Sequence, residues 1–172
     1  IMHGEILPAT SMTLRGIGKD YSVSMTPARE AVRRLIAEGA LMLSPSGRVS
    51  TAELTNDRIE ELAVMRSLIE VELSSRALPR AHSALIDRLK TINASVSQAI
   101  TTHNPVEYIR TNLEFHRMLY LRAQAPAMLA IAETVWLQLG PTMRSLYEQF
   151  SRKEPPHTHT AIIAALTAGD EP

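Results

Sequence analysis

The chain has 172 residues, of which 45% are hydrophobic and 21% are charged, so its composition is that of a globular protein and excludes general disorder. Eighteen basic residues balance eighteen acidic ones, which excludes any argument for a nucleic-acid partner that rests on total charge alone. Cysteine is absent, which excludes disulfides and thiolate metal ligands. No apolar run approaches the roughly 20 residues that a membrane helix needs, so we expect a cytoplasmic protein without membrane contact.

Residues 1–52 are predicted to fold as short helices followed by a small β-hairpin. Thr26 followed by Pro27 is typical of the first turn of a helix, and Gly39 is typical of the end of one. Residues 41–50 read as strand, turn and strand around the sequence PSG. A helix followed at once by a hairpin indicates a winged helix-turn-helix arrangement.

Long amphipathic helices follow, because apolar residues recur at helical spacing from residue 55 onward. Gly140 and Pro141 are expected to kink or divide the fourth of these helices. The fold class is therefore mainly α, with a winged helix-turn-helix DNA-binding domain over residues 1–52 and an all-α helical-bundle effector domain over residues 55–172. The helices are expected near residues 55–79, 83–101, 105–124, 127–150 and 157–168.

The predicted helix after Thr26 presents Arg29 and Arg33 on the face opposite its apolar residues. Arginine near the start of a helix can bind a guanine edge with two hydrogen bonds, and the hydroxyls of Ser24 and Thr26 can bind phosphates. Arg48 follows in the predicted hairpin, where a wing would contact DNA. An exposed arginine face can equally be a solvated surface, and periodicity alone leaves both interpretations open.

The sequence SVSMTPAREAVRRLIAEGAL, followed by SPSGRV, closely resembles the winged-helix signature of the GntR family of bacterial regulators. The resemblance implies a transcriptional regulator, commonly a repressor, that binds double-stranded operator DNA. Met25 departs from the signature, which usually has arginine there, so we expect one base contact to be missing. Gly16, Gly18 and Tyr21 are also less typical of the family. The DNA contacts implied by the resemblance are Arg15, Ser24, Thr26, Arg29, Gly47 and Arg48, to which the exposed helix face adds Arg33.

Arg66 and Glu70 share a helical stripe with apolar residues of the first long helix, so both charges are expected on its buried face. One interpretation is an ion pair between these two residues, which lie one turn apart. The other is that Arg66 faces an internal cavity and binds the carboxylate of a ligand through two hydrogen bonds. The residues alone leave both interpretations open.

Asn112 and His116 lie one turn apart on the apolar side of the third long helix. His159 shares an apolar stripe in the last predicted helix, and His157 is a weaker substitute because it lies off that stripe. A single inward histidine is usually a hydrogen-bonded core residue. For two inward histidines and an amide oxygen on separate helices of one bundle, a divalent metal site is favoured about as strongly as this structural interpretation.

The sequences RSLIE, NLEFH and HTAIIAALTAGD resemble three landmarks of the FadR-type C-terminal domain, the FCD domain, of one GntR subgroup. The resemblance implies a homodimer and a divalent metal held by Asn112, His116 and His159, with zinc first and nickel or manganese as alternatives. It also implies a small organic acid whose carboxylate binds the metal and Arg66. The subgroup has a further metal-binding histidine on a final helix, before which this sequence ends, and often has asparagine where Pro126 stands. As a neutral ligand, Asn112 is expected to bind more weakly than aspartate.

We therefore expect a dimeric, ligand-responsive regulator that is not an enzyme. Binding of the acid in the helical bundle would change the relative placement of the two winged domains and release the operator. A constitutive DNA-binding module with a purely structural metal is one alternative. A metal-dependent enzyme is the weaker alternative, because no general base is apparent beside the predicted metal ligands.

Overall fold

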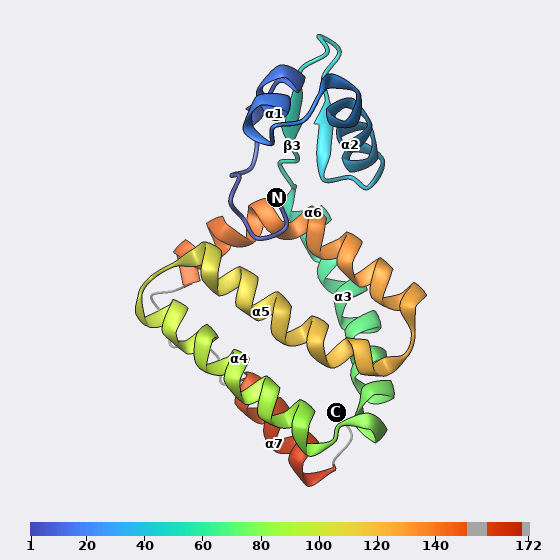
Figure 1. Ribbon diagram of the computed structural model, residues 1–172, viewed down its shortest axis with the longest axis vertical. Helices are drawn as coiled ribbons and strands as arrows, with labels where there is room; N and C mark the ends of the chain where they lie inside the picture. The colour runs from blue at the N-terminus through green and yellow to red at the C-terminus, as the bar shows by residue number, and fades with distance from the viewer. Residues whose placement is uncertain (151–157, 170–172) are drawn as a thin grey trace.

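The computed structural model describes residues 1–150 and 158–169, with residues 148–150 described by their backbone alone. The fold is mainly α-helical and includes one small three-stranded sheet near the N-terminus (Figure 1). No helix in the described ranges is long and apolar enough to cross a membrane. In chain order the elements are β1 (Ser11–Met12), α1 (Leu14–Asp20), α2 (Met25–Ala37), β2 (Leu41–Leu43), β3 (Val49–Thr51), α3 (Asn56–Ala77), α4 (Ser83–Thr101), α5 (Pro105–Tyr120), α6 (Pro126–Phe150) and α7 (Thr158–Ala168), with short 3-10 helices at Leu78–Arg80 and Leu121–Ala123.

The N-terminal part contains α1, α2 and an antiparallel sheet with the strand order β1-β3-β2. The predicted helix and hairpin are both confirmed, and α2 follows Ser24 and ends before Gly39, whose φ is +75°. Glycine adopts this left-handed conformation without steric cost, which explains why the helix stops there. Strand β1 was not predicted, because its two residues are too short to show alternation. The small apolar core of this part is formed by Val32, Leu41 and Val49.

The long helices confirm the predicted helices to within a few residues, apart from residue 157, which lies outside the described ranges. Local capping explains two of the starts. The hydroxyl of Thr55 accepts a hydrogen bond from the amide of Arg58 at the start of α3. The side chain of Asn104 accepts one from the amide of Glu107 at the start of α5, where Pro105 occupies the first helical position.

Helix α6 corrects one expectation, because it runs as a single helix through Gly140 and Pro141. Proline removes one backbone donor and crowds the preceding turn. Here Leu139, Gly140 and Pro141 are all buried, and α6 packs against both α3 and α5. Tertiary packing therefore outweighs the local cost of the proline. The predicted division of this helix is wrong, and the kink that was its alternative stays a prediction.

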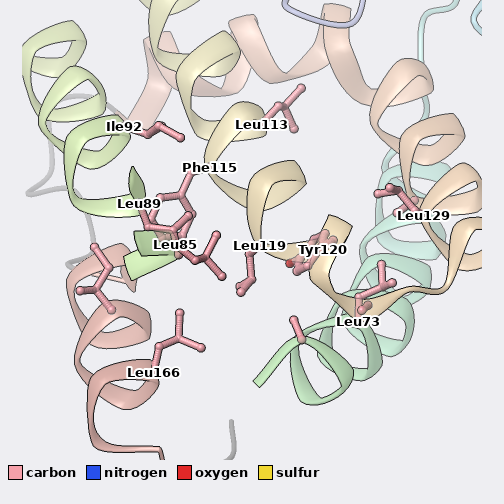
Figure 2. Packing of buried hydrophobic residues seen from close by; sticks show 14 of the residues in the cluster. Leu73, Leu85, Leu89, Ile92, Leu113, Phe115, Leu119, Tyr120, Leu129 and Leu166 are labelled. Carbon is pink, nitrogen blue, oxygen red and sulfur yellow. The ribbon is translucent and has the colours of Figure 1, made fainter. Parts of the chain in front are cut away.

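The helices α3 to α7 share one apolar core. Helices α4 and α5 lie side by side, with α7 against α4 (Figure 1). Leu89 of α4 and Phe115 of α5 are fully buried between their helices, while Leu73 and Leu129 close the core on the side of α3 and α6 (Figure 2). This packing fixes which faces of α5 and α7 point inward, and those faces carry the polar side chains of the candidate site.

The N-terminal part of the chain rests on α6 (Figure 1). A Cβ at Gly140 would lie only 2.5–2.7 Å from backbone atoms of residues 1–2, so glycine is required for this close approach. A Cβ at Gly39, which follows α2, would lie 3.1 Å from the side chain of Gln138 on α6. Gln138 also accepts a hydrogen bond of 3.0 Å from Arg58 of α3. One short stretch of α6 therefore contacts both the start of the chain and the end of α2.

Candidate functional site

A cavity of about 470 Å³ lies among α3, α4, α5, α6 and α7. Its wall brings together the four residues that the sequence predicted for metal and ligand binding, which come from three different helices. A binding site requires polar side chains from several elements to meet in one cavity, and unrelated core residues would not do so. The predicted residues are Arg66, Asn112, His116 and His159, and the other polar side chains of the wall are Asn93, Ser97, Thr101, Tyr108, Thr158 and Thr160.

His116 of α5 and His159 of α7 face each other, with their Nε2 atoms 3.3 Å apart. The ring of His159 stacks on the ring of Phe115, with a centroid distance of 3.9 Å and an interplanar angle of 12°. Because Phe115 is fully buried, this contact holds the His159 ring in one orientation. Within the described ranges no group of three His, Cys, Asp or Glu side chains is placed to hold a metal ion, and the predicted ligands His116, His159 and Asn112 all line this wall.

Each of the two histidines also has a partner on its other ring nitrogen. The Nδ1 atom of His159 lies 3.2 Å from Oδ1 of Asn93 on α4. The Nδ1 atom of His116 lies 3.2 Å from the hydroxyl oxygen of Tyr120, one turn later on α5. That hydroxyl donates a hydrogen bond of 3.0 Å to Oε2 of Glu70 on α3. The outer side of the site is thus a connected set of hydrogen bonds.

Burial lowers the pKa of both His116 and His159 to about 4. At His116 the nearby carboxylate of Glu70 opposes this effect without cancelling it. At neutral pH both imidazoles are therefore neutral, which is the form that binds a metal ion.

Arg66 and Glu70 form the ion pair that was one of the two interpretations of the sequence, with Nε of Arg66 2.6 Å from Oε1 of Glu70. Burial raises the pKa of Glu70, but the hydrogen bond and charge of Arg66 and a hydrogen bond from Trp136 outweigh it, and the pKa lies below its usual value. Arg66 also lines the cavity, and its Nη1 atom has no hydrogen bond among the described residues. The ion pair is confirmed, and ligand binding by Arg66 stays a prediction.

A second hollow, of about 540 Å³, lies between α2 and the hairpin of β2 and β3, and its wall includes Arg29, Arg33 and Arg48. On the exposed side of α2, Arg34 is held in an ion pair, whereas Arg29 and Arg33 form none with any described residue. The side chain of Ser24 makes no capping hydrogen bond at the start of α2. All the predicted DNA contacts are exposed: Arg15, Ser24, Thr26, Arg29, Arg33, Gly47 and Arg48.

Gly47 turns the hairpin with a φ of +79° and has no atom within 4 Å of the place where a Cβ would stand. Glycine is therefore needed for its backbone conformation and not for space. The amide of Gly47 donates to the carbonyl of Ser44, and the amide of Arg48 donates to the Ser44 hydroxyl. These two bonds fix the turn that carries Arg48 beside α2.

Sequence reasoning missed four residues of the helical site. Tyr120 had a detectable signal, because it lies one turn after His116 on the same helix. The others are distant in sequence from the residues they contact: Asn93 is 66 residues from His159, and Trp136 is 66 residues from Glu70. Only the packing of the helices brings such pairs together. The missed residues are Asn93, Phe115, Tyr120 and Trp136.

Residues 61–172 match the FCD domain family, which is more than half of the chain. The chain belongs to the FCD group of GntR transcriptional regulators. It is 23% identical over 171 residues to the HTH-type transcriptional regulator McbR of Escherichia coli strain K12, covering 98% of this chain and 77% of that protein. It is 26% identical over 164 residues to the gluconate operon transcriptional repressor of Bacillus subtilis strain 168, covering 88% of this chain and 65% of that protein.

Two solved structures share the fold of this FCD regulator. The structure of Escherichia coli McbR/YncC superposes with a TM-score of 0.86 at 23% identity, covering 99% of this chain and 82% of that one. A GntR regulator from Rhodococcus sp. RHA1 superposes with a TM-score of 0.80 at 17% identity, with the same two coverages of 99% and 82%. At these identities the likeness concerns the fold alone.

Proposed function

We propose that this FCD regulator is a homodimeric, ligand-responsive repressor that reads operator DNA with a winged helix-turn-helix over residues 1–52 and is released by a small organic acid. The acid would bind a metal-containing site in the helical part. The gluconate operon relative is a repressor by name, which supports this sign of regulation. The single observation that carries the sensing half is the pair of Nε2 atoms facing each other across 3.3 Å in a cavity.

The hollow lined by Arg29, Arg33 and Arg48 supports the proposal that residues 1–52 read DNA. Arg29 and Arg33 project from α2 without ion pairs among the described residues, and Arg48 approaches the same hollow from the hairpin. Guanidinium groups that no carboxylate neutralises are available for phosphates and for guanine edges. The hydroxyl of Ser24, which makes no capping hydrogen bond, adds a phosphate contact at the start of α2. Gly47 lets the wing turn approach the DNA backbone.

The donor set fits a divalent metal. Two imidazole nitrogens bound to tetrahedral zinc at about 2.0–2.1 Å lie about 3.3 Å apart. The Nε2 atoms of His116 and His159 have this separation, and both rings are neutral at pH 7. The amide oxygen of Asn112 is the third donor in the same wall. When bound, the ion would supply a positive centre with open positions for a carboxylate; zinc fits, and nickel or manganese are alternatives.

Arg66 can serve the ligand without giving up its ion pair. Its Nε and Nη2 atoms point to Glu70, which holds the guanidinium in place, while Nη1 remains for an oxygen in the cavity. A preorganised guanidinium loses little conformational entropy when it binds an anion. The two interpretations of Arg66 in the sequence are therefore compatible, and we propose that both hold.

An exposed apolar stripe on α3 supports the homodimer. Val64, Leu68 and Val71 are 59%, 71% and 56% exposed and follow one another at helical spacing. Ile131, 48% exposed, lies on α6, which packs along α3. An apolar stripe exposed along one face of a helix is typical of a subunit interface. A second copy of this chain, paired through α3, would bury them.

Selection of duplex DNA from a random library tests the proposal. The purified protein should enrich one sequence family with two related half-sites, and its affinity for the enriched duplex should fall when a matching small carboxylic acid is added with zinc. Specific binding that no acid in a broad panel changes would support the constitutive module with a structural metal. Metal-dependent consumption of an acid would support an enzyme. No enrichment at all would contradict the proposal.

A further inference from the structure

We infer that Tyr120 and Asn93 are positioning residues that aim the Nε2 lone pairs of His116 and His159 at one point, with Glu70 anchoring Tyr120. The inference rests on the proposed metal site and extends it to residues that lie behind the metal ligands. It follows from the direction of each hydrogen bond, because a neutral imidazole has one N–H and one lone pair.

The direction is fixed first at His159. Its Nδ1 atom lies 3.2 Å from Oδ1 of Asn93, and a carbonyl oxygen can only accept. The proton of the neutral His159 ring is therefore on Nδ1. Its Nε2 atom then carries a lone pair, which faces His116.

At His116 the direction is fixed through two steps. Glu70 accepts hydrogen bonds from Nε of Arg66 at 2.6 Å and from Nε1 of Trp136 at 2.8 Å, as a carboxylate does. The Tyr120 hydroxyl therefore gives its proton to Oε2 of Glu70. The Tyr120 oxygen is then free to accept, 3.2 Å from Nδ1 of His116. The proton of His116 is therefore also on Nδ1, and its Nε2 atom carries a lone pair.

Two lone pairs then face each other across 3.3 Å with no proton between them. The arrangement would relax if either ring moved its proton to Nε2, because an N–H would then donate to the opposite nitrogen. That change would break the bond to Asn93 or to Tyr120, and the stacking of His159 on Phe115 hinders a ring flip. The hydrogen bonds to Asn93 and Tyr120 thus hold both rings with the proton on Nδ1, the tautomer that binds a cation through Nε2. Repulsion between the two lone pairs costs free energy, and a bound cation would remove that cost.

Glu70 extends the same network to the ligand side. Its carboxylate accepts hydrogen bonds from Arg66, Trp136 and the Tyr120 hydroxyl. One carboxylate therefore orients both the guanidinium that faces the cavity and the tyrosine that sets the tautomer of His116. The metal ligand and the anion-binding arginine are held by a shared anchor.

Nitrogen NMR of the histidine side chains in the metal-free, full-length protein tests the inference, because ¹⁵N shifts distinguish the two tautomers. We expect Nδ1–H at both His116 and His159. In Tyr120→Phe, His116 should change to Nε2–H, while His159 keeps Nδ1–H. Zinc affinity, measured by competition with a coloured chelator, should fall about 10- to 100-fold in this variant.

Tyr108→Phe is the matched control, since Tyr108 lines the same cavity and has no described hydrogen bond to a histidine. It should keep both tautomers and the wild-type zinc affinity. Asn93→Leu is the second variant, needed if Tyr120→Phe does not fold, and it should change the tautomer of His159 alone.

Nε2–H at either histidine of the wild-type protein would overturn the inference, as would an unchanged zinc affinity in a folded Tyr120→Phe. If zinc fails to bind the wild-type protein while both tautomers are as expected, the metal proposal falls and the positioning roles stand.

Discussion

His116, His159 and Glu70 show how single residues acquire their state from burial. The two histidines lose their charge because the cavity wall desolvates them, and their pKa falls to about 4. Glu70 is also buried but keeps its charge, because Arg66 and Trp136 stabilise the carboxylate. Neutral nitrogen donors and a fixed carboxylate behind them are what a metal site requires.

Arg29→Ala tests the DNA-reading residues. Loss of a base-edge contact should weaken binding to the selected operator by ~1 to 3 kcal/mol, measured by fluorescence anisotropy. Arg34→Ala is the matched control on the same helix, because Arg34 is already paired with Glu38. If the two substitutions weaken operator binding equally, Arg29 contributes only its positive charge and makes no base-edge contact.

Arg66→Ala tests the ligand residue. The variant should bind the operator as the wild-type protein does but lose its response to the acid, because the carboxylate then loses its guanidinium partner. Arg76→Ala, which removes an exposed arginine paired with Glu72 on the same helix, should keep the response. A response that survives in Arg66→Ala would leave that residue with a structural ion pair only.

At the scale of elements, the helices could be predicted because capping and periodicity act locally. Thr55 and Asn104 are hydrogen-bonded caps at the predicted helix starts. Pro141 led to the wrong expectation of a divided α6, because the cost of a proline acts locally whereas the packing that offsets it involves residues distant in sequence. The inward placement of His116 and His159 followed from their stripes, and Tyr120 lies one turn after His116 on the same helix. The contact of His159 with Asn93 depends on how α7 packs against α4.

Gly140→Ala tests the contact between α6 and the start of the chain. The new Cβ would lie 2.5–2.7 Å from backbone atoms of residues 1–2, and crowding of this kind costs about 1–3 kcal/mol of unfolding free energy in denaturant titrations. In a chain that begins at Glu5 the same substitution should be nearly neutral, which makes a double-mutant cycle. An equal cost in both chains would show that the penalty arises elsewhere.

At the scale of the whole molecule, α6 contacts both the cavity of the helical part and the N-terminal part. Met143 lines the cavity of about 470 Å³ in the helical part, while Gln138 and Gly140 contact the N-terminal part. A change at the cavity wall would therefore reach the N-terminal part, which we propose reads DNA, within two turns of one helix, and this is a physical route for coupling.

Leu68→Asp tests the dimer. A charge in the centre of the exposed stripe of α3 should convert a dimer to a monomer in analytical ultracentrifugation and weaken binding to a two-half-site operator. Leu121→Asp is the control, because Leu121 is 46% exposed and lies outside α3 and α6. A Leu68→Asp dimer of unchanged affinity would place the interface elsewhere.

The central claim is that His116, His159 and Asn112 hold a metal ion, and elemental analysis tests it most directly. The full-length protein is purified without an affinity metal, beside His116→Ala, and both are compared by circular dichroism. We expect near-stoichiometric metal in the wild-type protein and loss of most of it in His116→Ala at unchanged helical content. A wild-type protein without metal after incubation with zinc, or a His116→Ala protein with full occupancy, would contradict it.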